Sequence, residues 1–317
     1  MFRYFLYCIM LTVIIGCKQE HLKITTRYEN GNIEHEYFID KDAIKQGEFV
    51  GYFPNGVLSF KTNYTDGKTK DTIYYFSNNQ ENKLKIKNLQ LPNGQLYYEG
   101  FYPNGIISHK GVLNKQEKKV GIWKNYDKAG NLHFVKEYKI INGKEHTNQL
   151  WVMLPSGDTL TEGVSMKQRF DKSKLTLSDS IFCYFQTEVS AFKNTDSTQV
   201  SVVIPEDYTQ QNFTSDFSNL ARDPEEKEGI PTRTISDLAT QKQPHTLSKN
   251  IPVADQKKTV MFYWKPKRTG KDTLRGFFNE RHSFYDPDLE ENQKENRILT
   301  QLNKKIYFEH PIEVVDD

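Results

Sequence analysis

One spaced pattern occurs twice in the first half of this 317-residue chain. Residues 47–58 read GEFVGYFPNGVL, and residues 121–132 read GIWKNYDKAGNL. Both place a glycine, a large aromatic residue, a tyrosine, a second glycine and a leucine at the same offsets, 74 positions apart (121 − 47). A recurring spaced pattern is typical of a chain that stacks similar units, none of which buries its apolar face alone.

Short tripeptides that end in glycine punctuate the same half of the chain. They are ENG at 29–31, PNG at 54–56, 92–94 and 103–105, KAG at 128–130 and PSG at 155–157. Asparagine tolerates positive φ and glycine adopts it freely, so these tripeptides predict tight turns between antiparallel strands, with Gly56, Gly105 and Gly130 as turn residues. Gly31 and Gly56, like Gly105 and Gly130, are 25 positions apart, which predicts a stack of hairpins with that period.

Aromatic residues mark each copy of the pattern, and aligning on the turn glycine gives a third, looser copy that ends at Ile107. The rings of the three copies are Phe49, Tyr52, Tyr98, Phe101, Trp123 and Tyr126. Two interpretations stay open. The rings either bury one another as the core of the array, or form an exposed stripe that binds a partner.

Over residues 24–165 the pattern resembles that of MORN-repeat variant proteins, whose units read glycine, aromatic, tyrosine, glycine and leucine at this spacing. The resemblance implies an elongated, single-layered antiparallel sheet of successive hairpins that serves as an assembly or recognition surface. Some bacterial members of the family are antitoxin-like, so an immunity-like role is an alternative function.

The first 17 residues, MFRYFLYCIMLTVIIGC, carry one cation and then an apolar run. The run from Tyr4 to Ile15 is shorter than the roughly 20 residues that span a bilayer and suits a signal peptide. Its end resembles the lipobox of bacterial lipoproteins. The resemblance implies a signal peptide over 1–16, cleavage between Gly16 and Cys17, lipidation of Cys17, and a tether over 17–23. The alternative is an ordinary apolar leader or a short membrane helix.

The residues after Cys17 are Lys18, Gln19 and Glu20. An aspartate there would resemble an inner-membrane retention signal, so its absence favours the outer membrane, with the leaflet left open. Acyl chains stabilise membrane binding by about 0.8 kcal/mol per buried methylene, which makes such an anchor durable. Cys183 is then the only thiol of the mature chain. It is expected to be a small buried hydrophobe, with a reactive thiol as the alternative.

After Phe170 the turn tripeptides stop and short strand-like runs follow. The runs lie at 174–189, 198–204, 259–266, 272–278 and 304–315, and they predict an Ig-like β-sandwich over 170–317. Arg268-Thr269-Gly270 reads as the turn of a hairpin that joins two of these runs. The polar segment 205–258 reads as a long mobile insertion with a short helix at 215–221.

Composition and motifs exclude several functions. The net charge is +2, with +5 over residues 18–170 and −4 over residues 171–317. Neither half has the strongly basic charge that is typical of nucleic-acid binding. No Walker loop, nucleophile elbow or zinc-protease helix is present. Asp286–Glu291 reads as a solvated acidic turn rather than a Ca²⁺ loop, because it lacks the required glycine and spacing. Glu280–Ser283 combines an acid, a base and a hydroxyl, but neighbours in a strand point to opposite faces.

The sequence therefore predicts an all-β, lipid-anchored protein of the cell envelope that binds an envelope protein partner without catalysis, metal or cofactor. An enzyme with an unrecognised site is a further alternative. The expected contacts are with the membrane, through acylated Cys17, and with that partner.

Overall fold

A computed structural model describes residues 21–69, 72–193, 197–206, 212–220, 229–241, 249–285 and 299–316. Strands dominate these residues, and among them the α-helical class is represented by one short element, α1 (Val253–Gln256). The chain divides into two compact units, which end and begin at Gln90 and Leu91. The predicted all-β class is confirmed.

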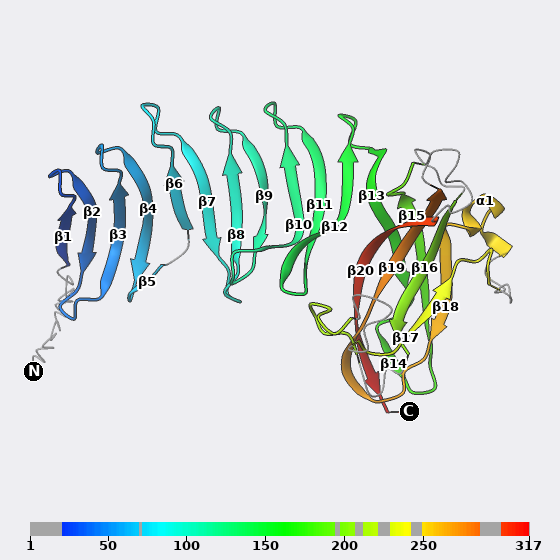
Figure 1. Ribbon diagram of the computed structural model, residues 1–317. Coiled ribbons are helices and arrows are strands. Elements are labelled where there is room, and N and C mark those ends of the chain that lie inside the picture. The colour runs from blue at the N-terminus through cyan, green and yellow to red at the C-terminus, as the bar shows by residue number, and fades with distance from the viewer. Residues whose placement is uncertain are drawn as a thin grey trace, which may run out of the picture. The chain divides into compact units, whose positions relative to one another are not determined.

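The first unit is an antiparallel meander (Figure 1). Its strands are β1 (Leu22–Arg27), β2 (Ile33–Ile39), β3 (Lys45–Tyr52), β4 (Leu58–Thr65), β5 (Lys68–Thr69), β6 (Thr72–Phe76) and β7 (Leu84–Gln90). They pair in the order β1-β2-β3-β4-β6-β7, with the short β5 paired to β4. This arrangement confirms the predicted sequence of hairpins. Alternating side chains put Tyr37, Phe49 and Phe60 on one face of the sheet and the Lys23–Glu36 ion pair (2.7 Å) on the other.

The meander is irregular between β4 and β6. The end of β4 folds back on β5, through Tyr64 with Thr69 and Thr65 with Lys68, so that only two residue pairs join β4 to β6. The side chain of Thr62 bridges the resulting gap by donating to the carbonyl of Thr72 at 3.0 Å.

The second unit contains two sheets (Figure 1). The first sheet runs in the order β8 (Leu96–Phe101), β9 (Ile107–Leu113), β10 (Lys119–Tyr126), β11 (Leu132–Ile141), β12 (Lys144–Met153), β13 (Thr159–Phe170), β15 (Ile181–Val189) and β18 (Thr259–Trp264). The second sheet runs in the order β14 (Lys174–Thr176), β20 (Leu299–Val315), β19 (Gly270–Tyr285), β16 (Thr198–Pro205) and β17 (Thr232–Ser236). All pairs in the second sheet are antiparallel except β14 with β20.

The main hydrophobic core of the second unit lies between the two sheets. Phe185 of β15 and Phe308 of β20 meet with ring centroids 4.6 Å apart, and both are nearly inaccessible to solvent. Ile181, Val202 and Leu274 are fully buried in the same cluster. Residues that alternate along these strands therefore supply one inner layer from each sheet.

The predicted hairpin at Arg268–Gly270 is wrong. The strand before it, β18, pairs with β15 in the first sheet, whereas β19 after it pairs with β16 and β20 in the second. The connection crosses from one sheet to the other. A turn motif between two strands does not distinguish pairing within a sheet from passage between sheets, because both require the chain to reverse.

The description of 205–258 as a mobile polar insertion is wrong for several of its described residues. β17 belongs to the second sheet, and residues 215–221 form no helix among the residues that the structure describes. Phe213 and Phe217 are buried, and they pack with Phe277 and Tyr307 of β19 and β20. Since Phe277 and Phe278 are neighbours in a strand, this second cluster covers the face of the sheet that is turned away from the main core.

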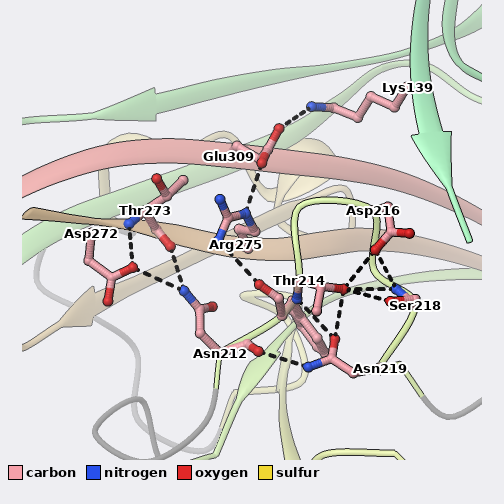
Figure 2. A network of polar contacts seen from close by, with 11 residues as sticks. Lys139, Asn212, Thr214, Asp216, Ser218, Asn219, Asp272, Thr273, Arg275 and Glu309 are labelled. Carbon is pink, nitrogen blue, oxygen red and sulfur yellow. Dashed lines mark hydrogen bonds and ion pairs between the residues drawn. The ribbon is translucent and has the colours of Figure 1, made fainter. Parts of the chain in front are cut away.

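Polar contacts hold the same segment in place (Figure 2). The side chain of Asn212 donates to the carbonyl of Thr273 at 2.9 Å, and Arg275 donates to the carbonyl of Phe213 at 3.2 Å. Arg275 also pairs with Glu309 at 2.8 Å, and Glu309 pairs with Lys139 of β11 at 3.1 Å. The linked side chains of Lys139, Glu309 and Arg275 thus connect the first sheet to β20 and β19, and Arg275 connects these strands to the 212–220 segment.

Candidate binding surface

The turns of the repeats share one hydrogen-bonding pattern. In the turn at 28–32, the amide of Tyr28 donates to the carbonyl of Asn32 and the amide of Gly31 donates to the carbonyl of Tyr28, both at 2.9 Å. The same two bonds close the turns that contain Gly56, Gly105 and Gly130, whose φ angles are 81°, 84° and 92°. These are three-residue hairpin loops whose third residue is left-handed, a position that favours glycine.

Successive turns along one edge are joined to each other. In the first unit the Tyr28 hydroxyl donates to the carbonyl of Tyr52 at 2.7 Å, 24 residues away. In the second unit Tyr102 donates to the carbonyl of Tyr126 at 2.8 Å, again 24 residues away. The second bond is the first one displaced by 74 positions (102 − 28), the offset that separates the two copies of the sequence pattern.

The six rings that the sequence singles out divide between two faces. Within each copy the two rings are three positions apart in one strand, so they point to opposite sides of the sheet. Phe49 and Trp123 are 8% and 2% exposed, and Tyr98 is half-buried. Tyr52, Phe101 and Tyr126 lie on the other face and are half-buried; Tyr52 donates to Glu36 at 3.1 Å, and Tyr126 lies beneath Lys110.

A row of stacked rings crosses the strands of the first unit on the Phe49 face. Phe49 contacts Tyr37 and Phe60, with centroids 5.0 and 5.6 Å apart, and Phe60 contacts Tyr75 at 6.2 Å. The Phe60 ring lies over Gly51, its partner across the β3–β4 pair, where a Cβ atom would be only 2.2 Å from the ring. Glycine at this position therefore makes room for the ring.

The second unit has the corresponding row of rings. Trp123 contacts Tyr98, His109 and Tyr138 with centroids 5.7, 6.1 and 6.3 Å apart. Its ring covers Gly111, where a Cβ atom would be 2.4 Å from it, and its indole nitrogen donates to the carbonyl of Val112 at 3.1 Å. Trp123 is thus fixed by both packing and a hydrogen bond.

A lysine lies over the rings in each unit. The ammonium of Lys45 is 4.6 Å from the centroid of Phe49 and 5.2 Å from that of Tyr64. The ammonium of Lys119 is 5.1 Å from Trp123 and 5.2 Å from Tyr138. All four distances lie within the range of attraction between a cation and a ring face.

These two groups are copies of each other. His35, Lys45, Phe49 and Tyr64 of the first unit correspond, at an offset of 74 positions, to His109, Lys119, Trp123 and Tyr138 of the second. We call them the first and second lysine–ring clusters. Sequence reasoning compared only the glycine, ring and leucine positions; extending the same offset to the flanking residues would have found the lysines, histidines and second rings.

The second lysine–ring cluster lies on the face of its sheet that is turned away from the second sheet. Tyr138 and Lys139 are neighbours in β11 and point to opposite faces. Lys139 faces β20, where it pairs with Glu309, so the second sheet contacts β11 on the side away from Tyr138. Burial and the nearby charge of Lys119 lower the pKa of His109, which keeps this histidine neutral near pH 7. Lysine is then the cation of the cluster.

A depression of about 520 Å³ lies beside the first cluster, at the gap between β4 and β6. Tyr64, Gln46 and Tyr74 contribute to its walls. The Gln46 amide donates to Asp40 and Asp66 at 3.1 and 3.0 Å, so its hydrogen-bonding groups are engaged within the protein. Because Tyr74 lies on the face opposite Phe49, the depression is not an extension of the row of rings.

Other residues that the sequence raised for chemistry are not brought together. Asp286–Glu291, Gly16 and Cys17 lie outside the described residues. Cys183 is fully buried, and burial strongly raises the pKa of its thiol. Within the part of the chain that the structure describes, no three or more His, Cys, Asp or Glu side chains are grouped as a metal site would require, and no helix is long and apolar enough to cross a membrane.

Comparison with known proteins adds no relative. No protein-family profile matches the chain, and no curated protein matches it significantly.

Proposed function

We propose that this protein is a lipid-anchored component of the bacterial cell envelope that binds an envelope protein partner without catalysis. The lipobox-like sequence that ends at Cys17 supports an acyl anchor, most simply in the outer membrane. The resemblance to MORN-repeat variant proteins and the two lysine–ring clusters support a recognition role for the hairpin repeats. An antiparallel two-sheet core supports an Ig-like assignment for residues 170–317.

The recurrence of the lysine–ring cluster is the observation that carries this proposal. Other positions differ between the copies: the PNG turn at 54–56 corresponds to KAG at 128–130. The lysine, the two rings and the histidine nevertheless recur with the same contacts. A pair of sites with one chemistry, one in each unit, suits a partner whose matching groups recur along its own chain.

The chemistry of the clusters indicates what the partner presents. Tyr64 of the first cluster and Tyr98, which packs against Trp123 of the second, are half-buried. They supply flat apolar surface with a polar hydroxyl, a combination enriched at protein interfaces. The adjacent ammonium groups favour acidic side chains. We therefore assign the partner an extended acidic segment with apolar residues at intervals.

Photo-cross-linking in intact membranes tests the binding role. A photoreactive amino acid at Tyr64 or Tyr98, which are half-buried, is expected to capture one discrete partner. The double variant Lys45→Ala/Lys119→Ala is expected to lower its yield roughly tenfold, at about 0.7 kcal/mol for each lysine. The matched control is Lys61→Ala/Lys110→Ala, because these lysines lie over Tyr74 and Tyr126 on the opposite face. Equal losses in both double variants, or no loss in either, would contradict the proposal.

Cell fractionation tests the anchor separately. Cys17→Ala is expected to release the protein from the membrane fraction, because the acylated sulfur is lost. A Cys8→Ala variant is the control, since that cysteine lies inside the proposed signal peptide. Continued membrane retention of Cys17→Ala would count against lipidation.

A further inference from the structure

The second unit contains a cavity of about 400 Å³ that has no part in the ring face. It lies between the end of β15, the start of β16, the second half of β19, and α1 with the two residues that follow it. Residues that line it include Thr187, Thr198, Val200, Lys257, Lys258 and Glu280. The volume falls within the range of about 300–1,000 Å³ that is typical of small-molecule sites.

A buried carboxylate lies in the wall of this cavity. Glu280 is only 2% exposed, in the interior of the second sheet, where it pairs with Val200 of β16 and Lys304 of β20. Its carboxylate accepts hydrogen bonds from the hydroxyl of Ser190 and from the amide of Ala191, the latter at 2.8 Å. Both donors are neutral, and none of the ion pairs between described residues includes Glu280.

Burial raises the pKa of Glu280, and the two hydrogen bonds and the more distant charges of Lys258 and His282 only partly offset this effect. A buried carboxylate held by neutral donors alone is costly to keep ionised. A cation placed in the cavity would lower that cost.

One residue in the wall of the cavity has a buried polar atom without a partner. The hydroxyl oxygen of Thr187 is buried and makes no hydrogen bond within the protein. Leaving a buried hydroxyl unpaired costs about 1–3 kcal/mol, so such groups need an explanation. A ligand that donates or accepts a hydrogen bond here would supply one.

The remaining walls set further limits on a ligand. Val200, Val253 and Ala254 provide an apolar side. Lys257 is exposed and Lys258 half-buried, so both ammonium groups are within reach of solvent and favour an anion near them. Glu280 thus favours a cation, Lys257 and Lys258 favour an anion, and the apolar residues favour a short apolar group.

We infer that this cavity binds a free α-amino acid with a small apolar side chain. In this arrangement the ligand ammonium pairs with Glu280 and hydrogen-bonds to the Thr187 hydroxyl. The ligand carboxylate pairs with Lys257 and Lys258, and its side chain contacts Val200 and Val253. The site goes beyond the proposed partner binding, and it does not depend on it.

Calorimetric titration of the purified full chain with L-alanine tests this assignment. Saturable binding at a single site is expected. Ethylamine, which lacks the carboxylate, and propionate, which lacks the ammonium, are each expected to bind at least about tenfold more weakly, because each leaves one charged wall without its counterpart. Ethylamine or propionate binding as tightly as alanine would overturn the assignment.

Two variants test the residues. Glu280→Gln is expected to weaken alanine binding at least about tenfold, because it removes the charge that faces the ammonium. Thr187→Val is nearly isosteric, and it is expected to weaken binding several-fold while raising the thermal stability of the ligand-free protein, because the unpaired hydroxyl is removed. If Thr187 had a purely structural role, Thr187→Val would not both weaken alanine binding and raise the thermal stability of the ligand-free protein.

Thr234→Val is the matched control, since this exposed threonine of β17 lies outside the cavity, and it is expected to leave alanine binding unchanged. If Glu280→Gln fails to fold, the Thr187→Val result decides alone. Unchanged alanine affinity in Thr187→Val, or no saturable alanine binding to the unaltered protein, would refute the site.

Discussion

The side chain of Asn148 forms both backbone hydrogen bonds of Tyr307. Its amide nitrogen donates to the Tyr307 carbonyl at 2.9 Å, and its carbonyl oxygen accepts from the Tyr307 amide at 2.7 Å. Tyr307 lies in β20, which pairs with β19 on one side but reaches β14 only at Glu313–Val315 on the other. Asn148 therefore takes the place of a neighbouring strand at an otherwise open edge.

Asn148→Ala is expected to destabilise the second unit by about 1–3 kcal/mol, because the amide and carbonyl of Tyr307 lose their partners in a buried setting. Hydrogen exchange at the Tyr307 amide should accelerate accordingly, and this is the measurement that isolates the effect. Lys144→Ala, at an exposed position of β12, is the control. Unchanged protection at Tyr307 would show that Asn148 does not hold this edge.

Gly111→Ala is expected to lower the unfolding free energy by about 1–3 kcal/mol, because the added methyl would lie 2.4 Å from the Trp123 ring and force it out of place. Tryptophan fluorescence and denaturant unfolding measure the two effects together. Gly105→Asn is the control: nothing lies within 4 Å of its would-be Cβ, and asparagine tolerates positive φ. If Gly111→Ala lowered the unfolding free energy no more than Gly105→Asn does, the proposed packing of the Trp123 ring on Gly111 would be refuted.

Acid is expected to weaken the contact between the first sheet and β20 through Glu309. Burial raises the pKa of this carboxyl, but Arg275 and Lys139 more than offset burial and hold the pKa below its ordinary value of 4.5. A lowered folded-state pKa stabilises the fold above the unfolded value, and that contribution is lost as pH falls through the folded value.

The stability difference between the unaltered protein and Glu309→Gln should therefore be larger at pH 7 than near pH 3. Thermal unfolding across this range measures it. Glu162→Gln, which removes an exposed carboxylate of β13, should show a much smaller change with pH. A difference for Glu309→Gln that is independent of pH would contradict the ion-pair assignment.

Cys183 is expected to resist alkylation in the folded protein. The residue is 0% exposed, and burial raises the pKa of the thiol, so the reactive thiolate is scarce at neutral pH. Iodoacetamide labelling followed by peptide mass spectrometry should show slow modification in buffer and rapid modification in denaturant. Rapid labelling in buffer would indicate a reactive thiol instead of a core residue.

Much of the fold could be predicted from the sequence because its signals are local. Asn-Gly turns, the 25-residue period and alternating side chains each depend on residues close together in the chain. The two errors arise where the decisive contacts are distant. Residues beside Arg268 look the same whether the next strand pairs in the same sheet or in another, and Phe213 and Phe217 lie in a polar segment but pack on strands some 60 to 90 positions further on.

The sequence predicts only some residues of the candidate surface, for a different reason. The offset of 74 positions identifies Phe49 and Trp123, but strand alternation separates them from Tyr52 and Tyr126, which were grouped with them. Lys45 and Lys119 carry no motif of their own. Their position over the rings depends on strand register, which a single sequence does not fix. Nothing in the sequence near Glu280 indicates a cavity, since its walls come from separate elements.

The bonds from Tyr28 to Tyr52 and from Tyr102 to Tyr126 have a consequence for how such a chain can change in length. Each bond joins the first residue of one turn to the carbonyl of the residue just before the next turn on the same edge. Gain or loss of one whole period leaves a matching donor and acceptor at the new junction, whereas gain or loss of a few residues misaligns every later turn. Homologous chains should therefore differ in length by multiples of one hairpin of about 25 residues.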